Sequence, residues 1–190
     1  MSSAGTDAGG ERPMLQRLGA RRPRTVLVGG ILTIAVAIVL FLVWPLPAVE
    51  EIAGPVLDTR FMASGSDAAD YLEELGSEGR RLYTIFAVGD LLWAVLHGLT
   101  VATAIAVGVR RSALSTRWAL TAVATLAYLV LDVAENSSVL AALAAHPAPQ
   151  PVPALAMDLI TSAKFVALGV AYVGLVVALV AWSRSGTDRV

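Results

Sequence analysis

Six side chains that can carry a charge or a strong hydrogen bond lie in stretches of sequence that are otherwise apolar. They are Asp90, His97, Asp132, Glu135, Asn136 and Lys164. Placing a charge in the hydrocarbon core of a membrane costs about 2.5–3.5 kcal/mol on insertion scales, so such residues are rare and usually face the interior of a helix bundle. Carboxyl, imidazole and ammonium groups can bind cations, exchange protons or act as general acid and base. These residues are therefore the first candidates for a functional site.

The spacing of these residues predicts which of them share a helix face. Asp90 and His97 are seven residues apart, which is close to two full turns. Asp132, Glu135 and Asn136 follow an i, i+3, i+4 pattern, which also defines one face. The sequence therefore predicts one polar face on each of two successive membrane helices.

Weaker candidates lie beside these residues. Tyr128 continues the polar face of the third apolar segment, one turn before Asp132. Lys164 is the single lysine of the chain and lies in the fourth apolar segment, where Thr161 and Asp158 precede it by one and about two turns. Tyr128, Asp158 and Thr161 are therefore secondary candidates.

The charged groups of the three helices are expected at similar depths in the membrane. At a rise of about 1.5 Å per residue, Asp90 and Glu135 lie about 12 Å below the outer ends of their helices, and Lys164 about 15 Å. Groups from three helices should therefore meet in the outer half of the membrane. Three carboxyls opposite one ammonium leave about two net negative charges in a low dielectric, so at least one carboxyl is expected to hold a proton. The sequence predicts a polar pocket that opens outward and shares a proton.

A purely structural explanation stands beside this hypothesis. Polar side chains can fasten membrane helices together through hydrogen bonds worth about 0.6 kcal/mol on average. We favour a ligand, proton or catalytic site for the group as a whole, because ionisable residues inside membranes tend to be functional. For His97 taken alone, a packing role is the favoured interpretation.

The composition indicates an integral membrane protein of one domain. Of the 190 residues, 56% are hydrophobic and only 15% charged, where soluble domains carry about 25% charged residues. The mean hydropathy is +0.70. Without cysteine, and with only His97 and His146 as imidazoles, the chain offers no thiolate or polyhistidine metal centre, so no metal and no cofactor are predicted. The net charge of −1 and the lack of a zinc-finger or Walker motif give no sign of nucleic-acid binding.

The expected fold class is all-α, a membrane bundle of four transmembrane helices. Stretches long enough to cross about 30 Å of hydrocarbon lie at about residues 25–44, 82–109, 118–143 and 154–182. The first could instead be a signal peptide, but its length and the lack of a cleavage site favour an uncleaved helix. Residues 25–183 should form the transmembrane domain, 1–24 a disordered cytoplasmic tail and 184–190 a second cytoplasmic tail.

The loop at residues 45–81 should contain a short amphipathic helix. Ala68, Tyr71, Leu72 and Leu75 repeat at i, i+3, i+4 and i+7 behind a polar N-terminal cap, and Gly76 follows as a stop. Arg60, in the segment Asp58-Thr59-Arg60-Phe61 of the same loop, is a secondary site candidate as part of a lid or as a buried anchor.

Arginine counts predict the orientation. Five arginines lie in the N-terminal tail, three at 110–117 and two after Trp182, whereas the first loop carries three over a longer stretch and the 144–153 loop has none. Positive charges favour the cytoplasmic side, so both termini should be cytoplasmic in a multi-pass protein of the cell (plasma) membrane. Trp44 then falls at the outer interface, and Trp118 and Trp182 at the inner one, as aromatic belts prefer.

The chain resembles a family of bacterial four-helix membrane proteins. The resemblance rests on Asp58-Thr59-Arg60-Phe61, on the stretch from Tyr71 to Arg81, on Asp90-Leu91-Leu92, on Asp132-Val133-Ala134-Glu135-Asn136 and on Thr161-Ser162-Ala163-Lys164. It implies the four-helix topology and the same choice of residues, and it implies no reaction. A looser similarity, of architecture alone, is to the sterol isomerase and sigma-2 receptor group, which also holds carboxylates in a membrane cavity.

Three functions remain open from the sequence. The first is binding or translocation of a small amphiphilic or cationic ligand, with the bilayer as the expected environment and proton exchange as a possible link. The second is a membrane enzyme that uses paired carboxyls as acid and base on a lipophilic substrate, with help from His97. The third is an accessory structural subunit. Whether the protein is an enzyme and which oligomer it forms stay undecided.

Overall fold

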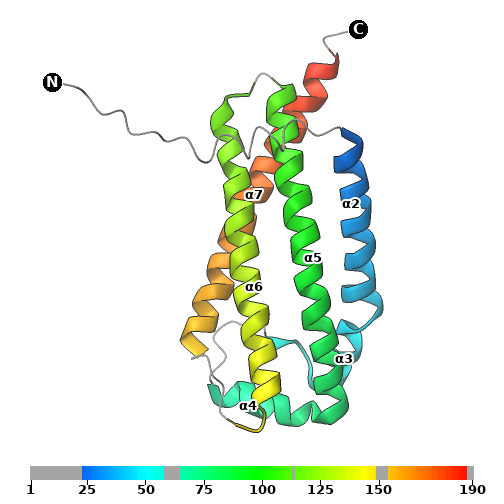
Figure 1. The fold of residues 1–190 in the computed structure, drawn as a ribbon, viewed down its shortest axis with the longest axis vertical. Helices are drawn as coiled ribbons and strands as arrows, with labels where there is room; N and C mark the ends of the chain where they lie inside the picture. Colours follow the sequence, from blue (N-terminus) through cyan, green and yellow to red (C-terminus); the bar gives the residue numbers. More distant parts are fainter. Residues whose placement is uncertain (1–22, 58–64, 113, 149–153, 188–190) are drawn as a thin grey trace, which may run out of the picture.

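The computed structural model describes residues 23–57, 65–112, 114–148 and 154–187, and its helices run mostly along one long axis (Figure 1). The helices are α2 (Pro23–Ala37), η1 (Ile38–Val43), α3 (Leu46–Ala53), α4 (Gly65–Glu74), α5 (Gly76–Arg111), η3 (Thr116–Leu120), α6 (Thr121–Ala145) and α7 (Ala154–Thr187). These described ranges contain no strand.

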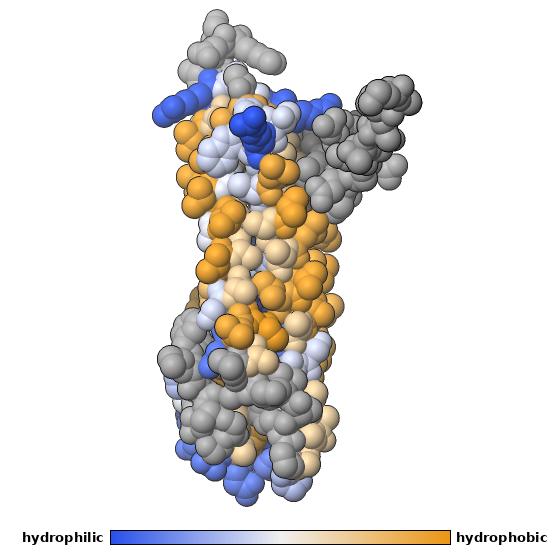
Figure 2. All heavy atoms as spheres, turned by 90° about the vertical axis from the view of Figure 1, so that its left-hand side faces the viewer, coloured by the Kyte–Doolittle hydropathy of each residue, from blue (hydrophilic) through white to orange (hydrophobic). Residues whose placement is uncertain are grey.

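Four of the helical stretches are long and apolar enough to cross a membrane. They are Arg24–Ala53, Gly76–Arg111, Thr116–Ala145 and Ala156–Ser185. Apolar residues form a belt between two hydrophilic ends, as Figure 2 shows for one face. The prediction of an all-α bundle of four transmembrane helices is therefore confirmed. Arg60 and the rest of 58–64 lie outside the described residues, as do 1–22 of the N-terminal tail and 188–190 of the C-terminal tail.

Helix α5 is the centre of the bundle. It packs against both α6 and α7, which also pack against each other, whereas α2 lies at the periphery and packs chiefly against α5 (Figure 1). The apolar stretch of α5 is 67% buried inside the bundle, against 6% for the first helix. A site among three helices must therefore lie between α5, α6 and α7.

Small residues let α5 and α7 approach closely near the end of the bundle that carries the termini. A Cβ built on Gly108 would lie 2.9 Å from the carbonyl oxygen of Ala178, so only glycine fits there. Buried side chains of α5, α6 and α7 continue this contact into one apolar cluster, made of Val101, Ala102, Ile105, Val109, Ala122, Ala171 and Ala178. This end of the bundle is closed by packed apolar side chains.

Helices α3 and α4 cover the opposite end of the bundle (Figure 1). A second apolar cluster joins them to α5 and α6, and it contains Val49, Ala53, Val56, Tyr71, Leu72, Leu75, Leu82, Tyr83, Phe86, Ala87, Val139 and Ala142. We call α3, α4 and this cluster the cap. The guanidinium of Arg80 donates to the Leu72 carbonyl at 2.7 Å and fastens α4 to α5.

Of the two helices of the cap, the sequence predicted α4 but not α3. The amphipathic helix α4 ends at Glu74, and Gly76 has a φ of 61° at the corner before α5, as the sequence predicted. Helix α3 was not predicted, because Pro45 and Pro47 directly follow the first apolar stretch, where proline usually ends a helix. Proline is tolerated in the first turn of a helix, and α3 uses Pro47 there. At the other end of the chain, α7 continues helically to Thr187.

Candidate functional site

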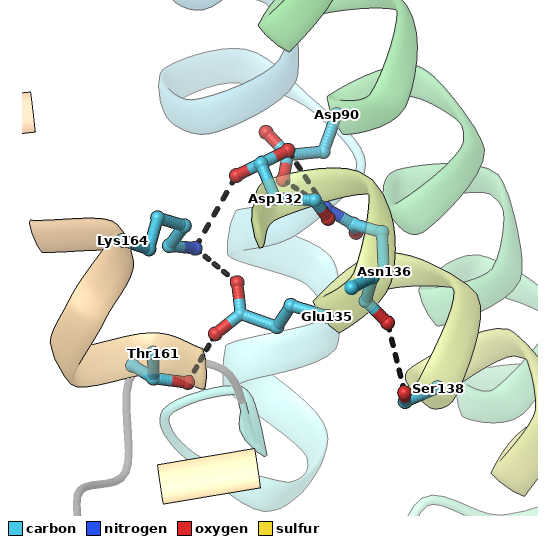
Figure 3. A network of polar contacts seen from close by, with 8 residues as sticks. Asp90, Asp132, Glu135, Asn136, Ser138, Thr161 and Lys164 are labelled. Atoms are coloured by element: carbon cyan, nitrogen blue, oxygen red, sulfur yellow. Dashed lines mark hydrogen bonds and ion pairs between the residues drawn. The ribbon is translucent and has the colours of Figure 1, made fainter. Parts of the chain in front are cut away.

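Polar side chains from α5, α6 and α7 form one buried network (Figure 3). We define the network as Asp90, Asp132, Glu135, Asn136, Thr161 and Lys164. Their exposed fractions lie between 0% for Glu135 and 7% for Lys164. Charged groups buried to this degree are tolerated only when paired or hydrogen-bonded.

Lys164 is the cation of the network. Its ammonium forms an ion pair with the Glu135 carboxylate and lies 3.3 Å from Oδ1 of Asp132. Thr161, one turn earlier on α7, donates its hydroxyl to the second carboxylate oxygen of Glu135. Glu135 therefore receives donors from two residues of α7, one on each of its oxygens.

Asn136 connects the remaining carboxyl to the network. Its side-chain nitrogen Nδ2 lies 3.0 Å from Oδ2 of Asp90 and 3.1 Å from Oδ2 of Asp132. The same nitrogen lies 3.2 Å from the backbone carbonyl of Asp132. One amide group thus serves two carboxyls on two helices, α5 and α6. Since an amide NH₂ has two hydrogens, it has no further donor to offer.

The helical period of α6 explains this arrangement. Asp132, Glu135 and Asn136 all point into the bundle because they are spaced by three and four residues. The predicted meeting of Asp90, Asp132, Glu135, Asn136 and Lys164 across three helices is thus what the structure contains, with Thr161 as a further member. Ser138, drawn beside them in Figure 3, donates to the backbone carbonyl of Ala134 at 2.8 Å.

His97 is buried, but its contacts are aromatic. Its ring stacks on Trp93 with centroids 4.6 Å apart and meets the edge of Tyr128 at 5.6 Å. Its Nε2 lies 2.8 Å from the hydroxyl of Tyr172 on α7. Trp93 and Tyr172 were not among the sequence candidates. The position of Trp93, one turn before His97, was the available signal.

The secondary candidates Tyr128 and Asp158 lie outside the network. Tyr128 is 2% exposed and lies between the network and His97 on the same face of α6. Asp158 is partly buried, about one turn before Thr161 on α7. Among the described residues there is no group of three or more histidine, aspartate or glutamate side chains placed to hold a metal ion.

Along the bundle, the network is followed toward α4 by Phe86 and Val139 of the cap. Toward the termini it is followed first by the buried side chains of Tyr128, His97 and Thr125 and then by the apolar cluster around Ile105. The network contains three carboxyls and one ammonium, that of Lys164, so complete ionisation of these groups would leave two net negative charges among them in a low dielectric. That surplus can be balanced by protons or by a bound cation.

The fold and this network define a multi-pass membrane protein with a buried site rich in carboxyls. No protein-family model, no characterised protein and no solved structure matches the chain. The chemistry of the site therefore carries the functional argument. Buried carboxyls with a shared amide donor and one ammonium can hold a proton, exchange it for a cation, or pass it to a substrate.

Proposed function

We propose that the protein binds a small cationic or amphiphilic ligand at the network and exchanges it for a proton. The observation that carries this proposal is the ratio of charged groups within the network, in which the three carboxyls of Asp90, Asp132 and Glu135 stand against the one ammonium of Lys164. A cation that enters the site replaces a proton and keeps the local charge constant. That exchange links ligand binding to proton release.

The network has two parts with different roles, which are connected because the Lys164 ammonium also lies 3.3 Å from Oδ1 of Asp132. Glu135 and Lys164, with Thr161, form an ion pair in which both carboxylate oxygens have donors. Asp90 and Asp132 share the neutral amide of Asn136. The Asp90–Asp132 pair is therefore where we place the exchangeable proton and the cation, since like charges at one site are relieved by either.

The charges at the two ends of the bundle bear on the localisation and topology of the protein. We place the protein in the plasma membrane with both termini cytoplasmic. Among the described residues, five exposed arginines lie at the end of the bundle that carries the termini, at positions Arg24, Arg110, Arg111, Arg117 and Arg184, and one, Arg81, lies at the cap end. The acidic surface of the cap lies at the opposite end, with Glu50, Glu51, Asp70, Glu73 and Glu74 exposed. This asymmetry matches the rule that positive residues stay inside.

Access to the network from outside requires the cap to move. Tyr71 and Leu72 of α4, and Leu75 directly after it, are each 2% exposed and pack in one cluster with residues of α5 and α6. The short helices α3 and α4 are joined to the rest of the chain by corners at Gly54, with a φ of 72°, and Gly76. We infer that the outward-opening state of the pocket is one in which α4 lifts from α5.

The experiment measures proton release on ligand binding. Tetraphenylphosphonium, a lipophilic monovalent cation, is added to the purified protein in weakly buffered detergent solution that contains a pH indicator. The wild-type protein should release close to one proton per bound cation, and Asp90→Asn should abolish release. Ser138→Ala is the matched control, because Ser138 lies beside the network and bonds only its own helix. Equal release from the wild type and Asp90→Asn rules out the exchange at this site.

An acid–base enzyme for a lipophilic substrate is the second candidate. It is favoured by the unequal surroundings of the carboxyls: Glu135 is bonded by an ammonium and a hydroxyl, whereas Asp90 is bonded by a neutral amide. Carboxyls in unequal surroundings can serve as acid and base. A co-purified lipid whose double bond is shifted by the wild type, and not by Asp90→Asn, would favour this candidate over simple exchange.

A further inference from the structure

A second polar position lies next to the network on the side of the termini, at His97 of α5 and Thr125 of α6. His97 is 5% exposed and Thr125 is 0% exposed. Neither Nδ1 of His97 nor Oγ1 of Thr125 has a hydrogen-bond partner within the part of the chain that the structure describes. Buried polar atoms of native proteins nearly always have a partner, whether protein or water. Two such atoms in one helix interface therefore need an explanation.

Thr125 differs from other threonines in these helices. Thr33, Thr84 and Thr103 each donate the hydroxyl to the carbonyl four residues earlier, at 2.8, 2.9 and 2.6 Å. This bond is the usual way in which a helical threonine satisfies its hydroxyl. The Thr125 hydroxyl does not make this bond, so it is free to donate to a group between the helices.

The two unpaired atoms belong to the same level of the α5–α6 interface. Gly98, the neighbour of His97, packs on Thr125: a Cβ at Gly98 would lie 3.7 Å from Cγ2 of Thr125. The His97 ring also touches Tyr128, which is one turn from Thr125 on the same face of α6. His97 and Thr125 thus supply polar atoms from both helices, and the His97 ring is in contact with the rings of Trp93, Tyr128 and Tyr172.

The hydrogen bond between Nε2 of His97 and Tyr172 leaves Nδ1 as the ring nitrogen that requires a partner. With Nε2 engaged by the Tyr172 hydroxyl, Nδ1 is an acceptor in one tautomer of the neutral imidazole and a donor in the other. A hydroxyl oxygen satisfies either tautomer, because it both donates and accepts.

We propose that His97 and Thr125 together bind an uncharged hydroxyl oxygen, either an internal water or the alcohol group of an amphiphile. This site is distinct from the carboxyl network and does not depend on the function proposed for the network. An oxygen at this position hydrogen-bonds to Nδ1 of His97 and to Oγ1 of Thr125, and so links α5 to α6. Internal waters typically make about three such bonds to buried polar groups.

The test is a double-mutant cycle on thermal stability of the full-length protein in detergent, with His97→Phe and Thr125→Val. Without a bound oxygen, Thr125 carries an unsatisfied hydroxyl, so Thr125→Val should raise the melting temperature or leave it unchanged. With a bound oxygen, the same change should lower it by several degrees, because the oxygen loses a partner. The His97→Phe background should remove most of that effect, since the shared ligand is already lost. Additive effects, or a stabilising Thr125→Val, overturn the proposal.

Thr103→Val is the matched control, because Thr103 is 6% exposed and bonds its own helix. Its effect should be small and the same in both backgrounds. Where His97→Phe does not fold, ¹⁵N NMR of the His97 ring replaces the cycle: Thr125→Val should shift the Nδ1 resonance, and an unchanged resonance overturns the proposal. Exhaustive removal of lipid separates the two sources of the oxygen. The coupling persists for a water, whereas for an amphiphile it disappears together with an alcohol detected by native mass spectrometry.

Discussion

Lys164 and Glu135 form an ion pair between α7 and α6 in which the Glu135 side chain is completely buried and that of Lys164 is 8% exposed. A lysine in a membrane helix can usually extend its ammonium to the interface. Here the ammonium turns inward to Glu135 and Asp132, and Thr161 supplies a further donor to the carboxylate. The pair thereby fixes α7 against α6 in rotation and in depth.

The first prediction concerns orientation. The chain has no cysteine, so introduced cysteines report without background. Asp70→Cys and Ala148→Cys lie at exposed positions of the cap end, and Ser115→Cys at an exposed position of the opposite end. A membrane-impermeant maleimide applied to intact cells should label the first two and should reach Ser115→Cys only after permeabilisation. The reverse labelling pattern would show that the termini are outside.

The second prediction concerns the contact between α5 and α7. Alanine is a better helix former than glycine by about 0.8–1.0 kcal/mol. At Gly108 this gain is outweighed, because the new Cβ would lie 2.9 Å from both the Cβ and the carbonyl oxygen of Ala178. Gly108→Ala should therefore lower the free energy of unfolding by about 1–3 kcal/mol, the usual cost of overpacking.

Gly169→Ala is the control for this change. It lies on α7, and a Cβ there would meet nothing within 4 Å. This variant should be neutral or slightly stabilising, as measured by thermal unfolding in the same detergent. If both alanine variants behave alike, the close approach of α5 and α7 is not a determinant of stability.

The sequence predicted the four membrane helices because about twenty apolar residues in a row leave few alternatives. It also predicted that Asp132, Glu135 and Asn136 share a face, since the helical period fixes that relation without any tertiary contact. The agreement in depth between Asp90, Glu135 and Lys164 followed from the rise per residue alone. These inferences depend only on local geometry.

The sequence did not predict which side chains of α7 meet those of the other helices, because these contacts depend on how each helix is rotated about its axis. A membrane helix is apolar both toward lipid and toward its neighbours, so its hydrophobic pattern does not define the buried face. For α7 the sequence therefore could not assign Lys164 to Glu135, nor bring Tyr172 to His97. Helix α3 was missed for a different reason: prolines that end one helix also begin the next, and local sequence does not separate these two uses.

The third prediction concerns Asn136, whose amide serves Asp90 and Asp132. Asn136→Leu keeps a similar volume and removes the donor, so two buried carboxyls lose a hydrogen bond at once. A buried polar group without its partner costs about 1–3 kcal/mol. The variant should be less stable by at least that amount, and proton release with tetraphenylphosphonium should change. Asp90→Asn combined with Asn136→Leu should recover part of the lost stability, whereas a further additive loss would show that the amide does not serve Asp90.

The fourth prediction concerns Lys164. Lys164→Met removes the ammonium and leaves Glu135 and Asp132 buried without their counter-charge. Loss of one partner of a buried pair typically costs about 3–5 kcal/mol, whereas removal of both partners costs much less. The single variant should therefore be strongly destabilised in a thermal or denaturant assay, and Lys164→Met with Glu135→Gln should recover a large part of that loss.

The double-mutant cycle of Lys164→Met with each carboxyl variant identifies the partners. Glu135→Gln should couple most strongly, because Glu135 bonds the ammonium directly and has no exposed surface. Asp132→Asn should couple more weakly at its distance of 3.3 Å. The exposed pair of Glu78 and Arg81, 3.4 Å apart and more than 60% exposed on both sides, is the control and should show almost no coupling. Strictly additive effects of Lys164→Met with both network carboxyls would mean that the ammonium is not paired in the membrane and instead reaches the outer interface.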